Sequence, residues 1–137
     1  MTKRRPFKLV PPRALEREEQ AALFAWSRMS ERAYPELEHM HSTQNGMAAS
    51  SIREAVLAKK AGMKPGIPDI FLPVPRGPYH GLFIELKRSG ATPSALSENQ
   101  KKCLAALNEF GFRAVMCAGW ESARAVILEY LETTCSQ

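Results

Sequence analysis

Short apolar runs alternate along the chain with longer segments in which apolar residues recur every three or four positions. Runs rich in Ile, Phe and Leu, or otherwise apolar and bounded by turn formers, are typical of strands, and they lie at 66–73, 81–87 and 112–118. A shorter strand is expected at 38–41, leading into a turn at 44–46. The longer segments predict helices at 13–30, at 50–61, from a cap at Ser94 or Ser97 to Gly111, and at 120–131.

Each predicted helix has an apolar stripe that should face a core. In the first helix we expect the stripe to hold Leu15, Ala22, Leu23, Trp26 and Met29. In the third helix it should hold Leu96, Leu104, Leu107 and Phe110, and in the last helix Ala123, Val126, Ile127 and Tyr130.

The two central apolar runs are separated by proline and glycine, so the chain should reverse direction between them. If the loop closes with Val74 opposite His80, Asp69 falls opposite Glu85. Because side chains alternate along a strand, Glu85 and Lys87 share one face while the apolar residues between them point to the other. Two carboxyl groups and an ammonium group are therefore expected together at one end of a strand pair.

Two neighbouring carboxylates repel each other unless a cation lies between them. Asp69 and Glu85 therefore indicate a divalent ion with oxygen ligands, Mg²⁺ or Mn²⁺. Lys87 could orient or deprotonate an attacking water, or neutralise charge that develops on a phosphate oxygen. This combination is the chemistry of phosphodiester hydrolysis. Without further context, the same residues also fit the solvated face of an exposed strand.

Two other parts of the pattern bear on this site. Glu16 and Glu19 flank the apolar stripe of the first helix and could reach the sheet beneath it, or they could only complement the helix dipole. Gln100 lies on the apolar stripe of the third helix, four residues from Leu96 and from Leu104. An amide facing a core needs a partner, which buried backbone or the carboxylate cluster could supply.

The chain has 137 residues, 45% hydrophobic and 24% charged, as expected of one soluble globular domain. Its net charge of +5 is unevenly distributed. Basic residues are concentrated in segment 1–12, which we expect to be a flexible arm. A second basic cluster, Lys59, Lys60 and Lys64, precedes Asp69. Such patches favour a polyanionic partner, although a basic tail is also a common solubility feature.

Several classes of protein are disfavoured. Three cysteines without a Cys-x-x-Cys spacing argue against a disulfide framework and a zinc site. No apolar run approaches the length of a membrane span and no signal-type segment is present, so a cytoplasmic location without membrane contact is expected. His39 and His41 share a spacing found in metal sites but lack a third ligand. His41 and Asn45 are better candidates for contacting a phosphate or a base.

The order of elements and the short motifs within it resemble the PD-(D/E)XK nuclease superfamily, and most closely its virus-type replication-repair nuclease (VRR-NUC) family. The resemblance runs from about Glu16 to Leu131, nearly the whole chain. Each motif is short, but their order and spacing together are specific. They are Glu16 with Gln20, the Asn45-Gly46 turn, the segment 64–69 that ends in Pro68-Asp69, the strand 81–87 with Glu85-Leu86-Lys87, and Ser97 with Gln100.

The resemblance implies an α/β fold: a single restriction-endonuclease-like domain, here 13–137, with a mixed sheet flanked by helices. It implies metal-dependent DNA cleavage in which Asp69, Glu85 and the Leu86 carbonyl are ligands and Lys87 lies near the attacking water. A first-helix glutamate should assist the metal. Glu16 has the expected distance from Gln20, whereas Glu19 lies closer to the apolar face.

The resemblance also implies a role for Gln100, contacts to DNA and a type of assembly, but it specifies these less closely than the metal ligands. Gln100 would orient Lys87 or contact the substrate. Contacts to DNA are expected from His41, Asn45, Lys64 and Arg88. Stand-alone members are similar to phage-encoded nucleases that act as homodimers, some of them on branched DNA such as four-way junctions.

The leading hypothesis is therefore a Mg²⁺- or Mn²⁺-dependent DNA endonuclease of a phage or prophage replication and repair type. One alternative is a module on a nuclease fold that binds branched DNA without cutting it. Another is a restriction-like enzyme that reads a specific sequence, although a chain of 137 residues offers little room for a recognition domain.

Overall fold

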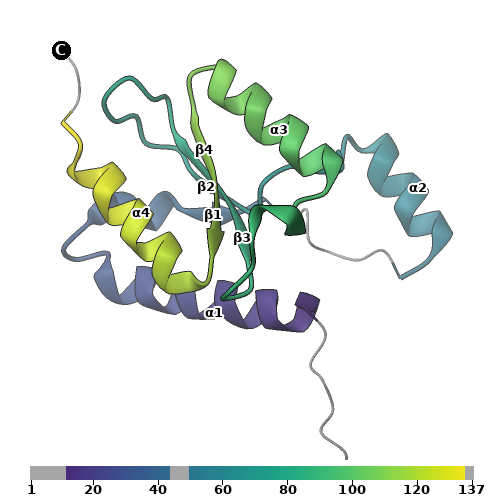
Figure 1. Ribbon diagram of the computed structural model, residues 1–137, viewed down its shortest axis with the longest axis horizontal. Coiled ribbons are helices and arrows are strands. Elements are labelled where there is room, and N and C mark those ends of the chain that lie inside the picture. Colours follow the sequence, from purple (N-terminus) through teal and green to yellow (C-terminus); the bar gives the residue numbers. More distant parts are fainter. Residues whose placement is uncertain (1–11, 44–49, 135–137) are drawn as a thin grey trace, which may run out of the picture.

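The computed structural model describes residues 12–43 and 50–134, so the predicted arm and the turn that contains Asn45 lie outside the described residues. A four-stranded sheet runs through the domain in the order β1-β2-β3-β4 (Figure 1). β1 pairs with β2 and β2 with β3 in antiparallel fashion, whereas β3 and β4 are parallel. The strands are β1 (His41–Ser42), β2 (Ile70–Leu72), β3 (Leu82–Lys87) and β4 (Arg113–Ala118).

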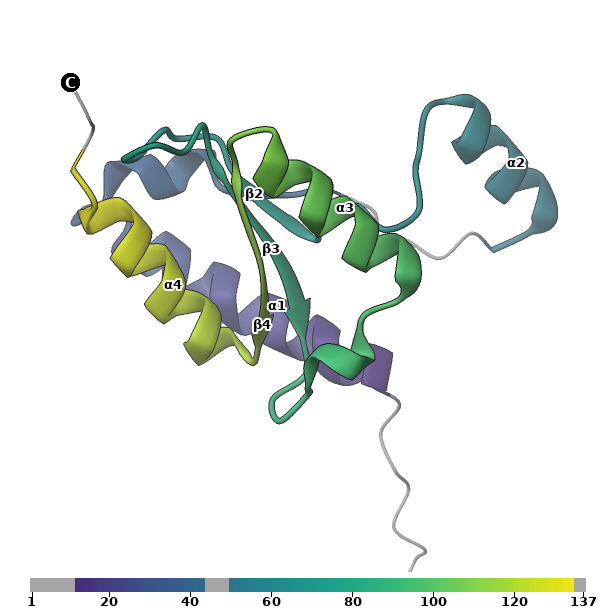
Figure 2. The ribbon, with the colours of Figure 1, turned by 45° about the horizontal axis from the view of Figure 1, so that its top comes forward.

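Helices cover both faces of the sheet, which confirms the predicted α/β class. α1 and α4 pack against each other on one face, and α3 lies against β4 on the opposite face (Figures 1 and 2). The helices are α1 (Pro12–Ser30), α2 (Ile52–Lys60), α3 (Glu98–Glu109) and α4 (Trp120–Glu132), with short 3₁₀ helices η1 (Pro35–His39) and η2 (Pro93–Ala95).

The core lies between the sheet and the α1–α4 layer. Apolar residues of β2 and β3 meet apolar residues of the two helices there, and nearly all of their surface is removed from water, which is the main driving force for this packing. Its almost completely buried members include Leu23, Ile70, Leu72, Leu82, Ile84, Leu86, Ile127 and Tyr130.

The register of β2 and β3 is the one expected from the sequence. Phe71 pairs with Phe83, and Ile70 pairs with Ile84. Extended by one residue, this register sets Asp69 opposite Glu85. The apolar residues of β3 alternate with Glu85 and Lys87, and these two charged residues are buried as well.

The predicted first strand is largely wrong. Residues 35–39 form the 3₁₀ helix η1, and only His41–Ser42 pair as a strand. Pro35 at the start of η1 has the fixed φ that suits a helical turn, and Leu37 is the buried anchor of that turn. A four-residue stretch carries too little periodicity to separate these two outcomes.

The helical stripes are correct in their centres and wrong at their ends. Met29 is 86% exposed and Phe110 is 66% exposed, although both fall on the predicted buried stripes. Met29 lies in the last turn of α1, and Phe110 is the C-terminal cap of α3, just before Gly111 with its positive φ of 93°. Spacing identifies the inward face of a helix but not the point where the helix runs past the sheet.

The start of α3 is fixed by Ser97 rather than Ser94. The Ser97 hydroxyl accepts a hydrogen bond from the Gln100 backbone N–H, and the Gln100 side chain accepts one from the Ser97 N–H. This reciprocal capping box satisfies two donors at the start of the helix. Gly66 approaches the same turn so closely that a Cβ there would lie 2.5 Å from the Asn99 carbonyl carbon. The segment before Asp69 is thereby held against α3.

α2 stands apart from the body of the domain (Figure 2) and buries none of its residues. Its apolar side chains are largely exposed, with Ile52 at 85%, Leu57 at 54% and Val56 at 48%.

In the parts of the chain that the structure describes, no helix is long and apolar enough to cross a membrane.

Asn108 connects α3 to β4, and its removal is expected to loosen the helix that carries Gln100. The Asn108 amide donates to the carbonyls of Leu104 and Ala114 and accepts from the Ala114 N–H. We expect Asn108→Ala to lower the free energy of unfolding by about 2 kcal/mol, because three hydrogen bonds are lost at once. Urea denaturation measures this value, and Lys102→Ala on the exposed face of α3 is the control. Equal stability of the two variants would contradict the role of Asn108.

Candidate functional site

Two carboxyl groups lie at the end of the β2–β3 pair, where the loop before β2 meets the last residues of β3. Asp69 Oδ2 accepts a hydrogen bond of 2.9 Å from the Leu86 backbone N–H. Glu85 is only 3% exposed. Its Oε1 is hydrogen-bonded, but its Oε2 is buried and no donor reaches it. A buried oxygen without a partner is costly in a finished structure, so this atom is a candidate ligand position.

Lys87 and Gln100 contact the buried carboxylate from two different elements. The Lys87 ammonium nitrogen, from β3, lies 3.6 Å from Glu85 Oε1. Gln100 Nε2, from α3, donates to the same oxygen at 3.0 Å. The other end of the same amide caps α3, because Gln100 Oε1 accepts a hydrogen bond from the Ser97 backbone N–H. The carboxylate cluster is therefore the partner that this amide required.

Burial and mutual repulsion disfavour the ionised forms of the two acids. Burial raises the pKa of Glu85 to about 8, and the negative charge of Asp69 adds to the effect. Burial also raises the pKa of Asp69, although the Leu86 N–H bond and the Lys87 charge act in the opposite direction. A carboxyl pair of this kind ionises readily only when a positive charge joins it, which makes the cluster a candidate functional site.

The two first-helix glutamates have different surroundings. Glu16 Oε1 lies 3.8 Å from the Lys87 ammonium nitrogen, at the edge of the carboxylate cluster. Glu19 Oε2 instead accepts a 2.6 Å hydrogen bond from the Trp120 backbone N–H, at the first turn of α4. Gly119, at the N-cap of α4, has no side chain to satisfy that donor, and the carboxylate also complements the helix dipole.

The residues expected to contact DNA are more scattered. Lys64 is exposed in the segment between α2 and β2, and Arg88 is exposed directly after β3. His41 is exposed on β1, where its ring contacts Phe71 edge-on and its Nδ1 bonds the His39 carbonyl. Asn45 lies outside the described residues.

The oxygen atoms of the cluster suit a hard divalent cation. Such ions prefer carboxylate and carbonyl oxygens, and Asp69 and Glu85 bring carboxylate oxygens to one place. The partnerless Glu85 Oε2 is the direct sign of this fit. Within 12–43 and 50–134 no group of three His, Cys, Asp or Glu could hold a metal, so a site here would also need the main-chain oxygen or solvent.

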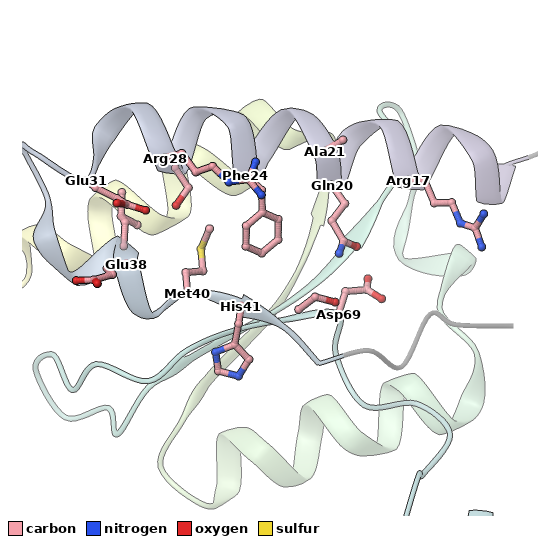
Figure 3. Close-up of a pocket in the computed structure, with 13 residues that line it drawn as sticks. Arg17, Gln20, Ala21, Phe24, Arg28, Glu31, Glu38, Met40, His41 and Asp69 are labelled. Atoms are coloured by element: carbon pink, nitrogen blue, oxygen red, sulfur yellow. The ribbon is translucent and has the colours of Figure 1, made fainter. Parts of the chain in front are cut away.

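A groove adjoins the cluster, and its lining was not anticipated from the sequence. It has a volume of about 810 Å³ and runs between α1 and the η1–β1 segment, with Asp69 at one end (Figure 3). Its α1 wall includes Arg17, Gln20, Phe24 and Arg28. These positions recur every three or four residues beside the buried stripe. This second stripe on α1, which mixes polar and apolar residues, is the sequence signal from which the groove wall could have been predicted.

The raised pKa of Glu85 has a consequence for stability in metal-free buffer. Between the ordinary value near 4.5 and about 8, the folded protein keeps a proton that the unfolded chain releases, so stability falls as pH rises through this window. Glu85→Gln removes this loss. At pH 8 with EDTA we expect the variant to be more stable than the parent by on the order of 2 kcal/mol, and at pH 5 to be nearly equal.

Thermal melts across this pH range measure the difference, with exposed Glu109→Gln as the matched control. A constant offset between Glu85→Gln and the parent at all pH values would show that the substitution acts through packing and not through the proton.

Comparison with known proteins agrees with the geometry. The family model of the VRR-NUC domain matches residues 8–121. A solved structure described as a VRR-NUC domain protein superposes with a TM-score of 0.73 at 27% sequence identity, covering 95% of this chain and 96% of the other. A search of curated proteins found no match. Because the family model spans most of the sequence and the fold agrees over nearly its whole length, the chain belongs to the VRR-NUC family of nucleases, which act on DNA.

Proposed function

We propose that this protein is a Mg²⁺- or Mn²⁺-dependent DNA endonuclease that hydrolyses phosphodiester bonds at the Asp69–Glu85 cluster. The observation that carries the proposal is the buried Glu85 Oε2 without a hydrogen-bond partner, next to a second carboxylate. Asp69, Glu85 and the Leu86 carbonyl would hold the ion. When bound, a divalent ion supplies Lewis-acid stabilisation of the charge on the phosphate.

The chain's own residues would position and neutralise the reacting groups. Lys87, which lies within 4 Å of both Glu85 and Glu16, can hold an attacking water or donate to a phosphate oxygen as negative charge develops there. Gln100 fixes the Glu85 carboxylate through its 3.0 Å hydrogen bond. Because α3 and β3 each supply one of these groups, their packing determines the geometry of the site.

Glu16 is the first-helix glutamate that we assign to the site. It is 3.8 Å from Lys87, whereas the Glu19 carboxylate is engaged by the first turn of α4. Glu16 would hold the Lys87 ammonium group in place and add negative charge that favours a cation. His41, Lys64, Arg88 and Asn45 would contact the flanking DNA.

The finer part of the proposal concerns substrate and assembly. We place the protein among nucleases of the phage or prophage replication and repair type that act in the cytoplasm on branched DNA, such as four-way junctions, as homodimers. This part rests on the resemblance to stand-alone phage-encoded members. Cleavage of a four-way junction, a flap, a single strand and a duplex in Mn²⁺, with sizing of the protein in solution, tests it directly.

Removal of one ligand or of the lysine should abolish cleavage without loss of the fold. We expect Asp69→Asn and Lys87→Ala each to reduce Mn²⁺-dependent cleavage of branched DNA by about 10³-fold or more, since each removes charge stabilisation at the reacting phosphate. EDTA should have the same effect on the parent protein. Binding of labelled DNA by both variants, measured by anisotropy, is the control for folding and substrate affinity.

Full activity in either variant or in excess EDTA would sink the metal-dependent mechanism. A module that binds DNA without cutting it would show no cleavage in the parent protein and no stabilisation of its thermal melt by Mn²⁺.

The two first-helix glutamates should separate activity from stability. We expect Glu16→Gln to lower cleavage at least about tenfold, because it removes the carboxylate beside Lys87, while the free energy of unfolding changes little. Glu19→Gln should instead lower that free energy by about 1 kcal/mol, because the charge-assisted bond to the α4 N-terminus is weakened, and should preserve cleavage. Initial cleavage rates and urea denaturation of the two matched variants decide the assignment. The reverse pattern would move the role to Glu19.

A further inference from the structure

The groove beside Asp69 has a mixed lining that suits part of a nucleic acid. Phe24 on α1 and Met40 after η1 form an apolar floor, and Figure 3 shows both side chains pointing into the groove between these elements. Gln20 points from α1 toward Asp69, and Arg17 lies beyond it at the same end. A flat apolar surface with a basic residue at its mouth fits an aromatic base that carries a phosphate.

The distribution of charge along the groove limits how a strand could enter it. Arg17 and Gln20 lie at the end near Asp69, whereas Glu31 and Glu38 lie at the far end beside Arg28 (Figure 3). Two carboxylates disfavour the approach of a phosphate. They can, however, accept hydrogen bonds from the amino groups of a base. A polyanionic backbone would therefore stay near Arg17, and the base would point inward.

Size excludes a duplex from the same place. A volume of about 810 Å³ is in the range of pockets that enclose one small ligand, far below that of a double helix. Only a base that has left its pair can enter, and the energetic cost of unpairing is lowest where the strand is already single. The groove would therefore distinguish DNA with an unpaired strand from an uninterrupted duplex.

We propose that the groove between α1 and the η1–β1 segment binds one unpaired base of the DNA strand next to the phosphate at Asp69, with Phe24 as the stacking surface and Arg17 as the phosphate contact. The inference rests on the proposed function for the identity of the ligand. It deepens that function by assigning the preference for branched DNA to Arg17 and Phe24, which line the groove and are not among the proposed metal ligands.

The test measures binding in EDTA, where no cleavage occurs, with three labelled probes: a duplex with a short unpaired flap, the same duplex without it, and the flap duplex with an abasic first unpaired position. The parent protein should bind the flap about tenfold more tightly than the other two probes, which is the effect expected of one stacked base. Arg17→Ala and Phe24→Leu should lose most of this preference. Arg32→Ala, an exposed arginine after α1 and outside the groove, should retain it.

A second readout reports stacking directly. With 2-aminopurine at the first unpaired position, fluorescence should be quenched by the parent and by Arg32→Ala, and not by Phe24→Leu, which keeps an apolar side chain against the core. Equal binding of the abasic and base-containing flaps by the parent protein would overturn the inference, whatever the variants do. Unchanged preference in Arg17→Ala and Phe24→Leu would also overturn it.

The two proposals fail in different ways. Base-dependent flap binding through the groove, with no cleavage of any DNA in Mn²⁺, would support the groove and overturn the endonuclease. Mn²⁺-dependent cleavage without base-dependent flap binding would support the endonuclease and overturn the groove.

Discussion

Repulsion between the buried carboxyl group of Glu85 and the half-buried carboxyl group of Asp69 is the constraint around which the rest of the site is arranged. The antiparallel register of β2 and β3 sets Asp69 opposite Glu85 at the end of the strand pair. Burial raises the pKa of both acids, that of Glu85 to about 8. The protein compensates only in part: Lys87 and Gln100 contact one oxygen of Glu85, and no hydrogen-bond donor reaches the other. The carboxylate charge left uncompensated by Lys87 and Gln100 is the reason for the cation that we propose at this site.

The surrounding elements hold this cluster through ordinary packing and capping contacts. Gln100 serves both the N-terminal cap of α3 and Glu85, so the start of a helix and the position of a carboxylate are coupled. Gly66 lets the chain before Asp69 approach α3 more closely than any side chain would permit. Glu19 ties α1 to the start of α4, and the neighbouring turn of α1 brings Glu16 to Lys87. Of these contacts, those of Gly66 and Glu19 hold the site in place and have no role in the chemistry that we propose.

The groove adjoins the carboxylate cluster and shares one helix, α1, with the core. The α1 helix contributes one stripe to the core and a second, mixed stripe to the groove wall, so a single element connects the sheet, the cluster and the groove. The position of Asp69 at the end of the groove makes the two features continuous (Figure 3). A strand lying there would present its phosphate to the cluster.

The sequence by itself determined the class of fold, the β2–β3 register, the inward faces of α1, α3 and α4 near their centres, and the family. Each of these depends on local periodicity or on short motifs in a fixed order. Only the tertiary structure decided that residues 35–39 form η1, that Met29 and Phe110 are exposed, and that Glu16 rather than Glu19 lies beside Lys87. Those outcomes depend on where a helix runs past the sheet and which neighbour it meets there. Spacing along one element contains no information about the surface of another.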